Sequence, residues 1–192
     1  MLLWGKGCKQ GVFCALSLGL LTLAHGVLAG EKHDDPRTHL PMRKAGLWEL
    51  TIHGHANAGS PPSQQVQQCT DGKAERIMLL AIVPTQENCS DVRVKRLTGQ
   101  PVDGYDITLV CHVHEQRIET QVALRGDLQS VYSGTYTTRQ PGALPRAPAA
   151  VNFQGRWLGN CKPDQRPGDM VLPNGITVNV VDDVRRAERH AH

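Results

Sequence analysis

The chain has 192 residues, of which 40% are hydrophobic and 20% charged, and its formal net charge is +3. Two of its 21 basic residues, Lys6 and Lys9, lie in an apolar leader, so the rest of the chain carries 19 basic side chains against 18 acidic ones. This near-neutral balance provides no electrostatic attraction to nucleic acid or to an anionic membrane, and we expect neither as a partner.

The first 29 residues have the pattern of a signal peptide. Lys6 and Lys9 precede an uncharged, mostly apolar run over residues 11–28, which ends in small residues suited to a signal peptidase. The pattern predicts cleavage after Ala29, with Gly26 as the second choice. The alternative is an uncleaved anchor, because about 18 apolar residues are near the minimum that spans a bilayer. We favour cleavage, which leaves a periplasmic or secreted protein without a transmembrane segment.

The segment after the leader changes from loop to strand to helix. Residues 30–43 are polar, include two prolines and show no periodicity, which predicts a flexible N-terminal arm. Alternating polar and apolar side chains over residues 45–53 predict a half-buried strand, and residues 64–69 a second short one. Asp71 is a suitable N-cap for the good helix formers of residues 72–80, where we expect one short helix.

Five further strands follow at the spacing of an antiparallel meander. Apolar side chains alternate with polar ones along them, as Ile107 and Leu109 do with Asp106 and Thr108. One face of the predicted sheet is therefore apolar and the other is polar. We expect a mainly β fold, a curved antiparallel sheet of about seven strands that forms a barrel or half-barrel with the helix over one opening. The five expected strands cover residues 91–97, 105–112, 117–124, 131–138 and 152–158.

The end of the chain differs in composition from the strands. Residues 163–192 contain prolines and glycines followed by a charged tail with histidines. This composition predicts a C-terminal extension that is largely disordered. Within it, only residues 176–181 have the pattern of an additional edge strand.

Four cysteines follow the leader, and an even number of cysteines in an exported chain indicates disulfides. Three pairings are open. We prefer Cys69 with Cys89, which ties the helical segment to the next strand, and Cys111 with Cys161, which joins a middle strand to the last one. A zinc or redox centre is the alternative, but the chain has no CxxC motif. The sequence therefore predicts a disulfide-stabilised fold.

Histidines form two HxH pairs, His53 with His55 and His112 with His114. Residues two apart in a strand project from one face, so each pair would present two imidazoles to one copper or zinc ion. If the two strands were neighbours, four nitrogens would converge. The simpler interpretation, which we prefer, is that these are exposed polar residues near strand ends, because no carboxylate is placed to orient the rings.

Four segments carry a resemblance to a known family. They are GLWEL at residues 46–50, QCT at 68–70, NC at 88–89 and GRWLGNC at 155–161. Together they resemble a bacterial family called domain of unknown function 3617 (DUF3617), over a domain of about residues 44–162. The resemblance implies an exported, small, cysteine-bearing β protein, and it implies no activity.

No arrangement of residues in the sequence indicates catalysis. Ser130 and Ser133 lack a base at motif spacing, and no cofactor is indicated. Trp48 and Trp157 alternate in phase with apolar neighbours, which favours core positions over ligand stacking. We expect a non-catalytic binding or accessory module of the bacterial cell envelope, whose concave sheet accepts an apolar ligand or an envelope protein. The alternative is a periplasmic copper or zinc binding protein that uses the HxH pairs.

Overall fold

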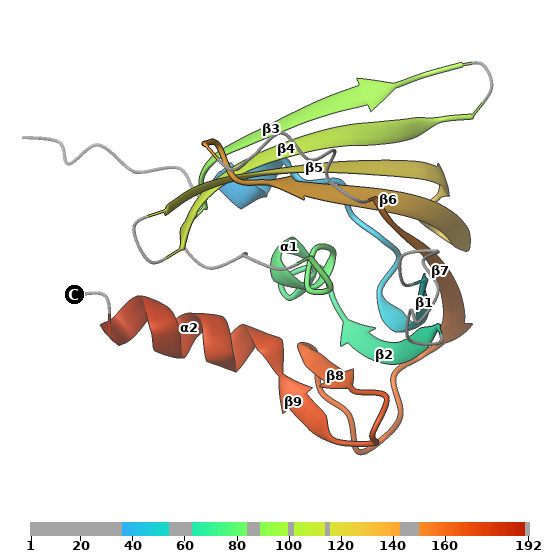
Figure 1. The fold of residues 1–192 in the computed structure, drawn as a ribbon. Coiled ribbons are helices and arrows are strands. Elements are labelled where there is room, and N and C mark those ends of the chain that lie inside the picture. The colour runs from blue at the N-terminus through green and yellow to red at the C-terminus, as the bar shows by residue number, and fades with distance from the viewer. Residues whose placement is uncertain are drawn as a thin grey trace, which may run out of the picture. The chain divides into compact units, whose positions relative to one another are not determined.

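The structure, a computed structural model, describes residues 36–53, 63–83, 89–99, 102–113, 116–142 and 150–190. All of them belong to one unit of the chain, residues 34–192. This unit contains a single antiparallel sheet, which curves around a short helix (Figure 1). The strands are β1 (Gly46–His53), β2 (Gln64–Thr70), β3 (Cys89–Leu97), β4 (Gly104–Val113), β5 (Gln116–Asp127), β6 (Val131–Arg139), β7 (Val151–Gly159), β8 (Asp169–Val171) and β9 (Thr177–Asn179). The helical elements are η1 (Pro36–His39), α1 (Glu75–Met78) and α2 (Val180–His190).

The sheet is open, in the order β3-β4-β5-β6-β7-β1-β2-β8-β9. The mainly β class and the curved antiparallel sheet are confirmed, whereas closure into a barrel is not. A closed barrel would require β2 to pair with β3. In the described part of the chain, β2 pairs with β8 instead, so the sheet is extended by further strands and does not close. Two strands, β8 and β9, extend the sheet beyond the seven of the meander; β9 lies within residues 176–181, where an additional edge strand was predicted, and β8 was not predicted.

The pairing of β1 with β7 joins the beginning of the meander to its end. Trp48 lies opposite Trp157 in this pair. Trp48 is fully buried, as expected of a core residue, and its Nε1 donates to the carbonyl of Lys44 at 2.8 Å. Trp157 is half-buried against the core, and the Lys44 ammonium lies 3.5 Å from the centroid of its ring.

Glycines opposite aromatic residues make room for the core between β6 and β7. Gly134 lies opposite Phe153, and Tyr132 lies opposite Gly155. A Cβ atom at Gly155 would overlap the Tyr132 ring, and one at Gly134 would overlap Phe153. The rings of Tyr132 and Phe153 therefore lie across the neighbouring strand and meet edge to face, with centroids 6.2 Å apart.

The predicted helix appears as a short one between turns. Asp71 Oδ1 accepts hydrogen bonds from the backbone N–H groups of Lys73 and Ala74 at 2.9 and 2.7 Å, so it caps the turn that leads into α1. After α1 the chain continues in turns to Val83, with i to i+3 hydrogen bonds such as Val83 N to Leu80 O at 2.8 Å. The helix is shorter than residues 72–80 because turns occupy the residues on both sides of it, and those after it are of the tighter i to i+3 kind.

The C-terminal extension is ordered over residues 163–190, and this corrects the prediction of a largely disordered segment. It contains β8, β9 and α2, the longer helix of the described chain. Val181 of α2 packs in a small cluster with Met78 of α1, and Arg166 Nη2 donates to Asp182 at 2.6 Å. These contacts join residues far apart in sequence, which a local pattern does not reveal. No helix of the described residues is long and apolar enough to cross a membrane.

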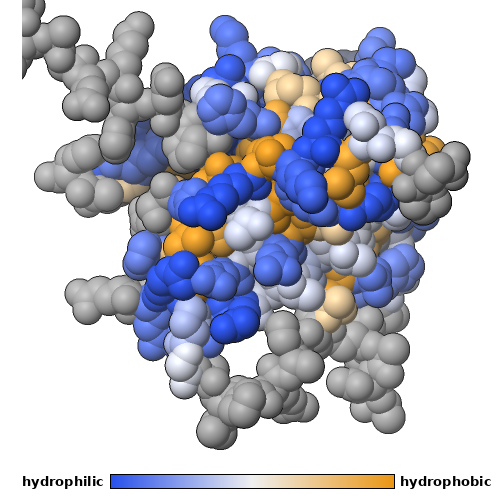
Figure 2. All heavy atoms as spheres, turned by 90° about the horizontal axis from the view of Figure 1, so that it is seen from above, coloured by the Kyte–Doolittle hydropathy of each residue, from blue (hydrophilic) through white to orange (hydrophobic). Residues whose placement is uncertain are grey.

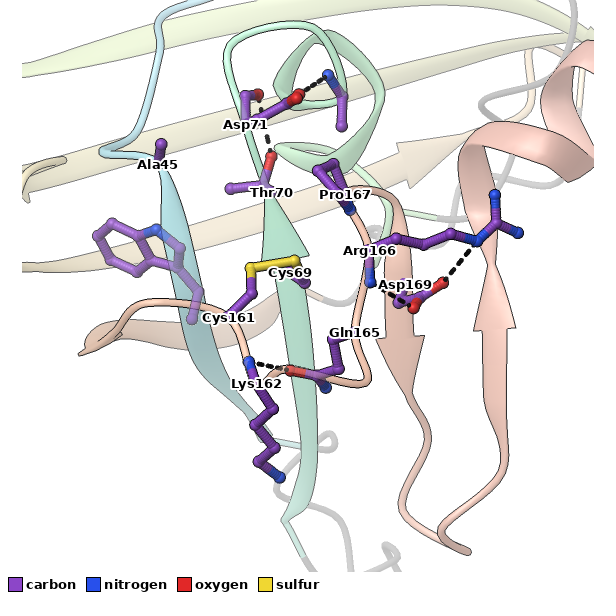
Figure 3. The surroundings of a disulfide bond; sticks show 12 residues. Ala45, Cys69, Thr70, Asp71, Cys161, Lys162, Gln165, Arg166, Pro167 and Asp169 are labelled. Carbon is purple, nitrogen blue, oxygen red and sulfur yellow. Dashed lines mark hydrogen bonds and ion pairs between the residues drawn. A yellow bond between two sulfur atoms is a disulfide. The ribbon is translucent and has the colours of Figure 1, made fainter.

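The four cysteines that follow the leader are all in disulfides, but the preferred pairing is wrong. The bonds join Cys69 with Cys161 and Cys89 with Cys111. Cys89 and Cys111 lie opposite each other on β3 and β4. Cys69 lies on β2 and Cys161 follows β7, and their Cα atoms are 5.4 Å apart because the chain that leaves β7 passes the start of β1 and reaches β2 (Figure 3). The preference assumed that Cys111 and Cys161 share a face, whereas Cys161 lies beyond the end of its strand.

Candidate functional site

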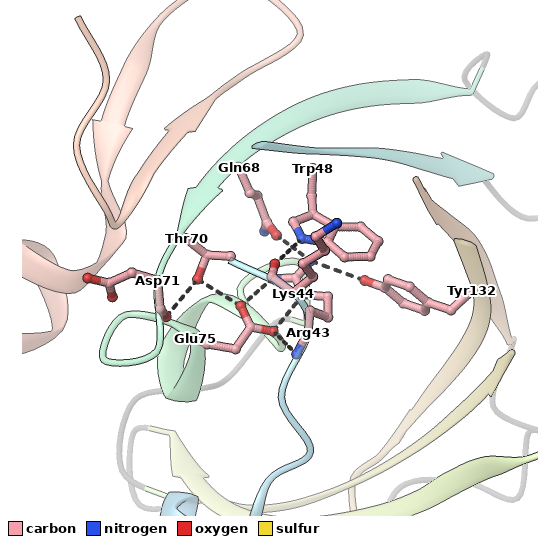
Figure 4. Close-up of polar contacts among 8 residues, drawn as sticks. All are labelled: Arg43, Lys44, Trp48, Gln68, Thr70, Asp71, Glu75 and Tyr132. Atoms are coloured by element: carbon pink, nitrogen blue, oxygen red, sulfur yellow. Dashed lines mark hydrogen bonds and ion pairs between the residues drawn. The ribbon is translucent and has the colours of Figure 1, made fainter. Parts of the chain in front are cut away.

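Two charged side chains, Arg43 and Glu75, form a buried ion pair inside the curve of the sheet (Figure 4). Arg43 lies three residues before the first residue of β1, and Glu75 begins α1. Arg43 Nε donates to Glu75 Oε1 at 2.6 Å, and Nη2 donates to Oε2 at 3.0 Å. The side chains are 0% and 1% exposed, respectively. The pair therefore joins the helical segment to the start of the first strand.

Inward-facing side chains of β2 and β6 surround this ion pair. Arg43 Nη1 donates to Gln68 Oε1 at 3.0 Å and to the Tyr132 hydroxyl at 3.2 Å. Thr70 Oγ1 donates to Glu75 Oε2 at 2.7 Å. Both charged groups thus have several hydrogen-bond partners, the arrangement that a buried ion pair requires to offset the loss of hydration.

The electrostatics of this cluster oppose acid–base chemistry. Burial by itself lowers the pKa of Arg43, but the interactions with Tyr132 and Glu75 outweigh it and raise that pKa above its ordinary value. Burial also raises the pKa of Tyr132, which keeps its phenol protonated. A permanently charged guanidinium and a neutral phenol exchange no proton near neutral pH. We interpret the cluster as a structural clamp that holds α1 on the sheet.

The histidine pairs are only partly within the described chain. His53 is exposed at the end of β1, and His112 is exposed near the end of β4, while His55 and His114 lie outside the described residues. Three strands separate β1 from β4. The neighbouring strands that a four-histidine site requires are therefore not present. Among the residues described, no group of three or more His, Cys, Asp or Glu side chains is placed to hold a metal ion.

The concave face, where the sequence suggested an apolar ligand, is occupied by the chain itself. Leu79, Leu80 and Val83 follow α1 and are buried in the same cluster as the inward residues of the sheet, among them Trp48 and Leu124. The segment between β2 and β3 therefore fills the concave face with its own apolar side chains. A ligand there would have to displace part of the core.

A shallow groove of about 360 Å³ lies on the opposite, outer face of the sheet. It crosses four neighbouring strands, β5, β6, β7 and β1. Figure 2 shows the molecule from above relative to Figure 1, which is the side of β3. On this surface, hydrophilic side chains lie between hydrophobic ones. The groove is lined by His53, Ala123, Arg125, Ser133, Gly134, Thr135, Asn152, Phe153 and Gln154.

The groove is hollow because small outward residues coincide in register. Ala123 lies opposite Thr135, which in turn lies opposite Asn152, and Ser133 of the next outward row lies opposite Gln154. Alternation along each strand directs all five side chains to the outer face. The floor of the groove is thus formed by the short side chains of β5 and β6, and its sides by longer ones.

Most polar side chains of the groove are free for a ligand. Within the described part of the protein, Ser133, Thr135, Asn152, Gln154 and His53 form no side-chain hydrogen bond. From the sequence, His53 was a candidate metal ligand and Ser133 a rejected nucleophile, whereas Thr135, Asn152 and Gln154 were not predicted as site residues. The signal in the sequence that indicates them is the series of Ser, Thr, Asn and Gln at outward positions of adjacent strands.

Arg125 differs from the other groove residues because it is already hydrogen-bonded. Its Nη2 donates to Asp106 Oδ1 at 2.6 Å, and its Nη1 donates to the carbonyls of Tyr105 and Leu124 at 3.0 and 2.8 Å. The guanidinium is thereby held along β4 and its charge is offset by the carboxylate. The groove has polar walls with no uncompensated arginine.

Comparison with known proteins identifies one family. A family model described as "Protein of unknown function (DUF3617)" matches residues 43–161. No curated protein and no solved structure matches the chain. The matched segment contains the buried ion pair, both disulfides and every residue that lines the groove, and it ends before β8, β9 and α2.

Proposed function

Because the chain belongs to the DUF3617 family, whose description names no activity, we propose its function from the geometry. The protein is a non-catalytic binding or accessory module of the bacterial cell envelope. It holds an envelope component in the groove on the outer face of its sheet.

One contrast between the two faces of the sheet carries this proposal. The concave face is filled, and its buried charges are paired and hydrogen-bonded. The outer face has a groove in which five polar side chains are unbonded within the described chain. Small-ligand sites are concave and direct a few polar groups toward one place, and their volumes are about 300–1,000 Å³. The groove has these properties.

The disulfides support a location outside the cytoplasm. All four cysteines that follow the leader are paired. Structural disulfides persist in oxidising compartments and are rare where glutathione and thioredoxin keep thiols reduced. Together with the leader, this favours export to the periplasm or beyond.

Export is tested by fractionation of a Gram-negative host that expresses the full chain, followed by intact mass spectrometry. We expect the protein in the periplasmic or secreted fraction, with a mass reduced by the leader and by the four hydrogens lost in two disulfides. Full-length protein in the cytoplasm with free thiols would contradict export.

Binding is tested by retention of envelope polysaccharide, lipid vesicles and envelope proteins on the immobilised mature protein. Thr135→Trp places a large side chain in the groove. Thr108→Trp is its matched control, because Thr108 is an equally half-buried, outward threonine of β4 outside the groove. We expect Thr135→Trp to lose retention of one fraction and Thr108→Trp to keep it. If wild-type protein retains no fraction, or if the two variants lose retention equally, the proposal is wrong.

A further inference from the structure

We infer that the outer groove takes a neutral saccharide, which is bound by hydroxyl and amide side chains. This inference rests on the proposed binding function and names the chemical class of the ligand. Four side chains carry it, Ser133, Thr135, Asn152 and Gln154.

The hydrogen-bonding chemistry of these four residues matches that of a sugar. Each hydroxyl of Ser133 and Thr135 both donates and accepts, and so does each amide of Asn152 and Gln154. A sugar hydroxyl also donates and accepts, so a ring with several hydroxyls satisfies all four side chains at once. An apolar ligand would remove water from them and leave them without partners, which is unfavourable.

The charge of the groove favours a neutral ligand. No Asp or Glu lines the groove, and its one arginine, Arg125, is held by Asp106 at 2.6 Å. Specific recognition of a carboxylate or phosphate uses charge-assisted hydrogen bonds from cations that are free to make them. The groove offers no free guanidinium or ammonium group, and this favours a neutral ligand over an anionic one.

The spacing of the four side chains matches the size of a sugar ring. Ser133 lies opposite Gln154, and Thr135 lies opposite Asn152. Opposite residues of antiparallel strands have Cβ atoms about 5 Å apart, and residues two apart along a strand are separated by about 7 Å. The four polar groups therefore outline a rectangle comparable in size to a six-membered sugar ring with its hydroxyls. Ala123 lies beside them and offers a small apolar contact for the C–H groups of such a ring.

The position of the groove in the sheet excludes an extended peptide as the ligand. Proteins bind extended peptides by adding a strand at a sheet edge, where backbone groups are free. The groove lies over β5, β6, β7 and β1, which pair with strands on both sides. Their backbone hydrogen bonds are used within the sheet, so the ligand has to be recognised by side chains.

The inference is tested by isothermal titration of the mature protein with neutral trisaccharides (maltotriose, cellotriose, mannotriose and triacetylchitotriose) and with anionic trigalacturonate. We expect at least one neutral trisaccharide to bind and trigalacturonate to bind more weakly. Gln154→Ala should weaken binding about three- to tenfold, the loss of one neutral hydrogen bond. Gln121→Ala is the matched control, since Gln121 is an exposed, outward glutamine of β5 outside the groove, and it should leave binding unchanged.

The outcomes separate this inference from the proposed function. Retention of an envelope lipid or protein that Thr135→Trp abolishes, without binding of any neutral trisaccharide, would overturn the saccharide and leave the binding function standing. Tighter binding of trigalacturonate than of every neutral sugar would overturn the argument from charge. Equal weakening by Gln154→Ala and Gln121→Ala would place the sugar outside the groove.

Discussion

The buried ion pair allows the sharpest prediction about stability. Glu75→Leu removes the carboxylate and leaves the Arg43 guanidinium buried with only neutral partners, Gln68 and Tyr132. The Arg43 side chain is 0% exposed, so water cannot replace the lost carboxylate without a change in the fold. We therefore expect the variant to be strongly destabilised.

The size of the effect follows from the burial of the pair. Removal of one partner of a buried ion pair costs about 3–5 kcal/mol, because the other charge stays desolvated. For a protein of this length such a loss lowers the Tm by about 6–20 °C. An apolar pair of similar volume has no such penalty, so the double variant Arg43→Met/Glu75→Leu should recover most of the loss.

Urea and thermal unfolding at pH 7, with the disulfides intact, measure these differences. The control is Asp91→Asn, because the ion pair of Asp91 with Arg93 at 2.9 Å is exposed and such pairs contribute less than about 1 kcal/mol. The reasoning is refuted if Glu75→Leu costs no more than Asp91→Asn. It is also refuted if the double variant is as unstable as the single variant, since uncompensated charge would then not be the cause.

Three further predictions concern the core, the disulfides and alkaline pH. Gly155→Ala forces a Cβ atom into the Tyr132 ring and should cost about 1–3 kcal/mol in urea unfolding, whereas Gly72→Ala, which has open space around it, should be nearly neutral. Alanine substitution of the disulfide that spans 92 residues should cost about 5 kcal/mol, against about 3 kcal/mol for the one that spans 22; equal losses would contradict the chain-entropy account. Because burial raises the pKa of Tyr132, its contribution to stability is present below the pKa of the unfolded tyrosine, about 10, and is lost as the pH rises through the folded value. Tyr132→Phe should flatten this alkaline decline in melting temperature.

The strands were predictable because their signal is local. Alternation of side chains locates β1 and β4 to β7 within a few residues and directs Ile107, Leu109 and Trp48 to the core, where the structure has them. The same alternation predicts a curved sheet, since one face of the sheet is apolar. The family resemblance over residues 44–162 agrees with the match over residues 43–161.

The features that were missed depend on register between distant strands. Which cysteines pair is decided by the position of Cys89 opposite Cys111, and alternation within one strand does not contain that information. The groove likewise exists because Ala123, Thr135 and Asn152 align across three strands. The helix α2 was missed because its apolar contact, Val181 with Met78, joins residues that lie far apart in the sequence.

The location of the ligand is the most direct test of this account. In a ¹H–¹⁵N NMR titration of the mature protein with envelope polysaccharide, the account predicts amide shifts that cluster at the groove, around Ser133 and Thr135 of β6 and Asn152 and Gln154 of β7. Shifts centred on α1 and on the concave residues behind it, or no shifts at all, would contradict it.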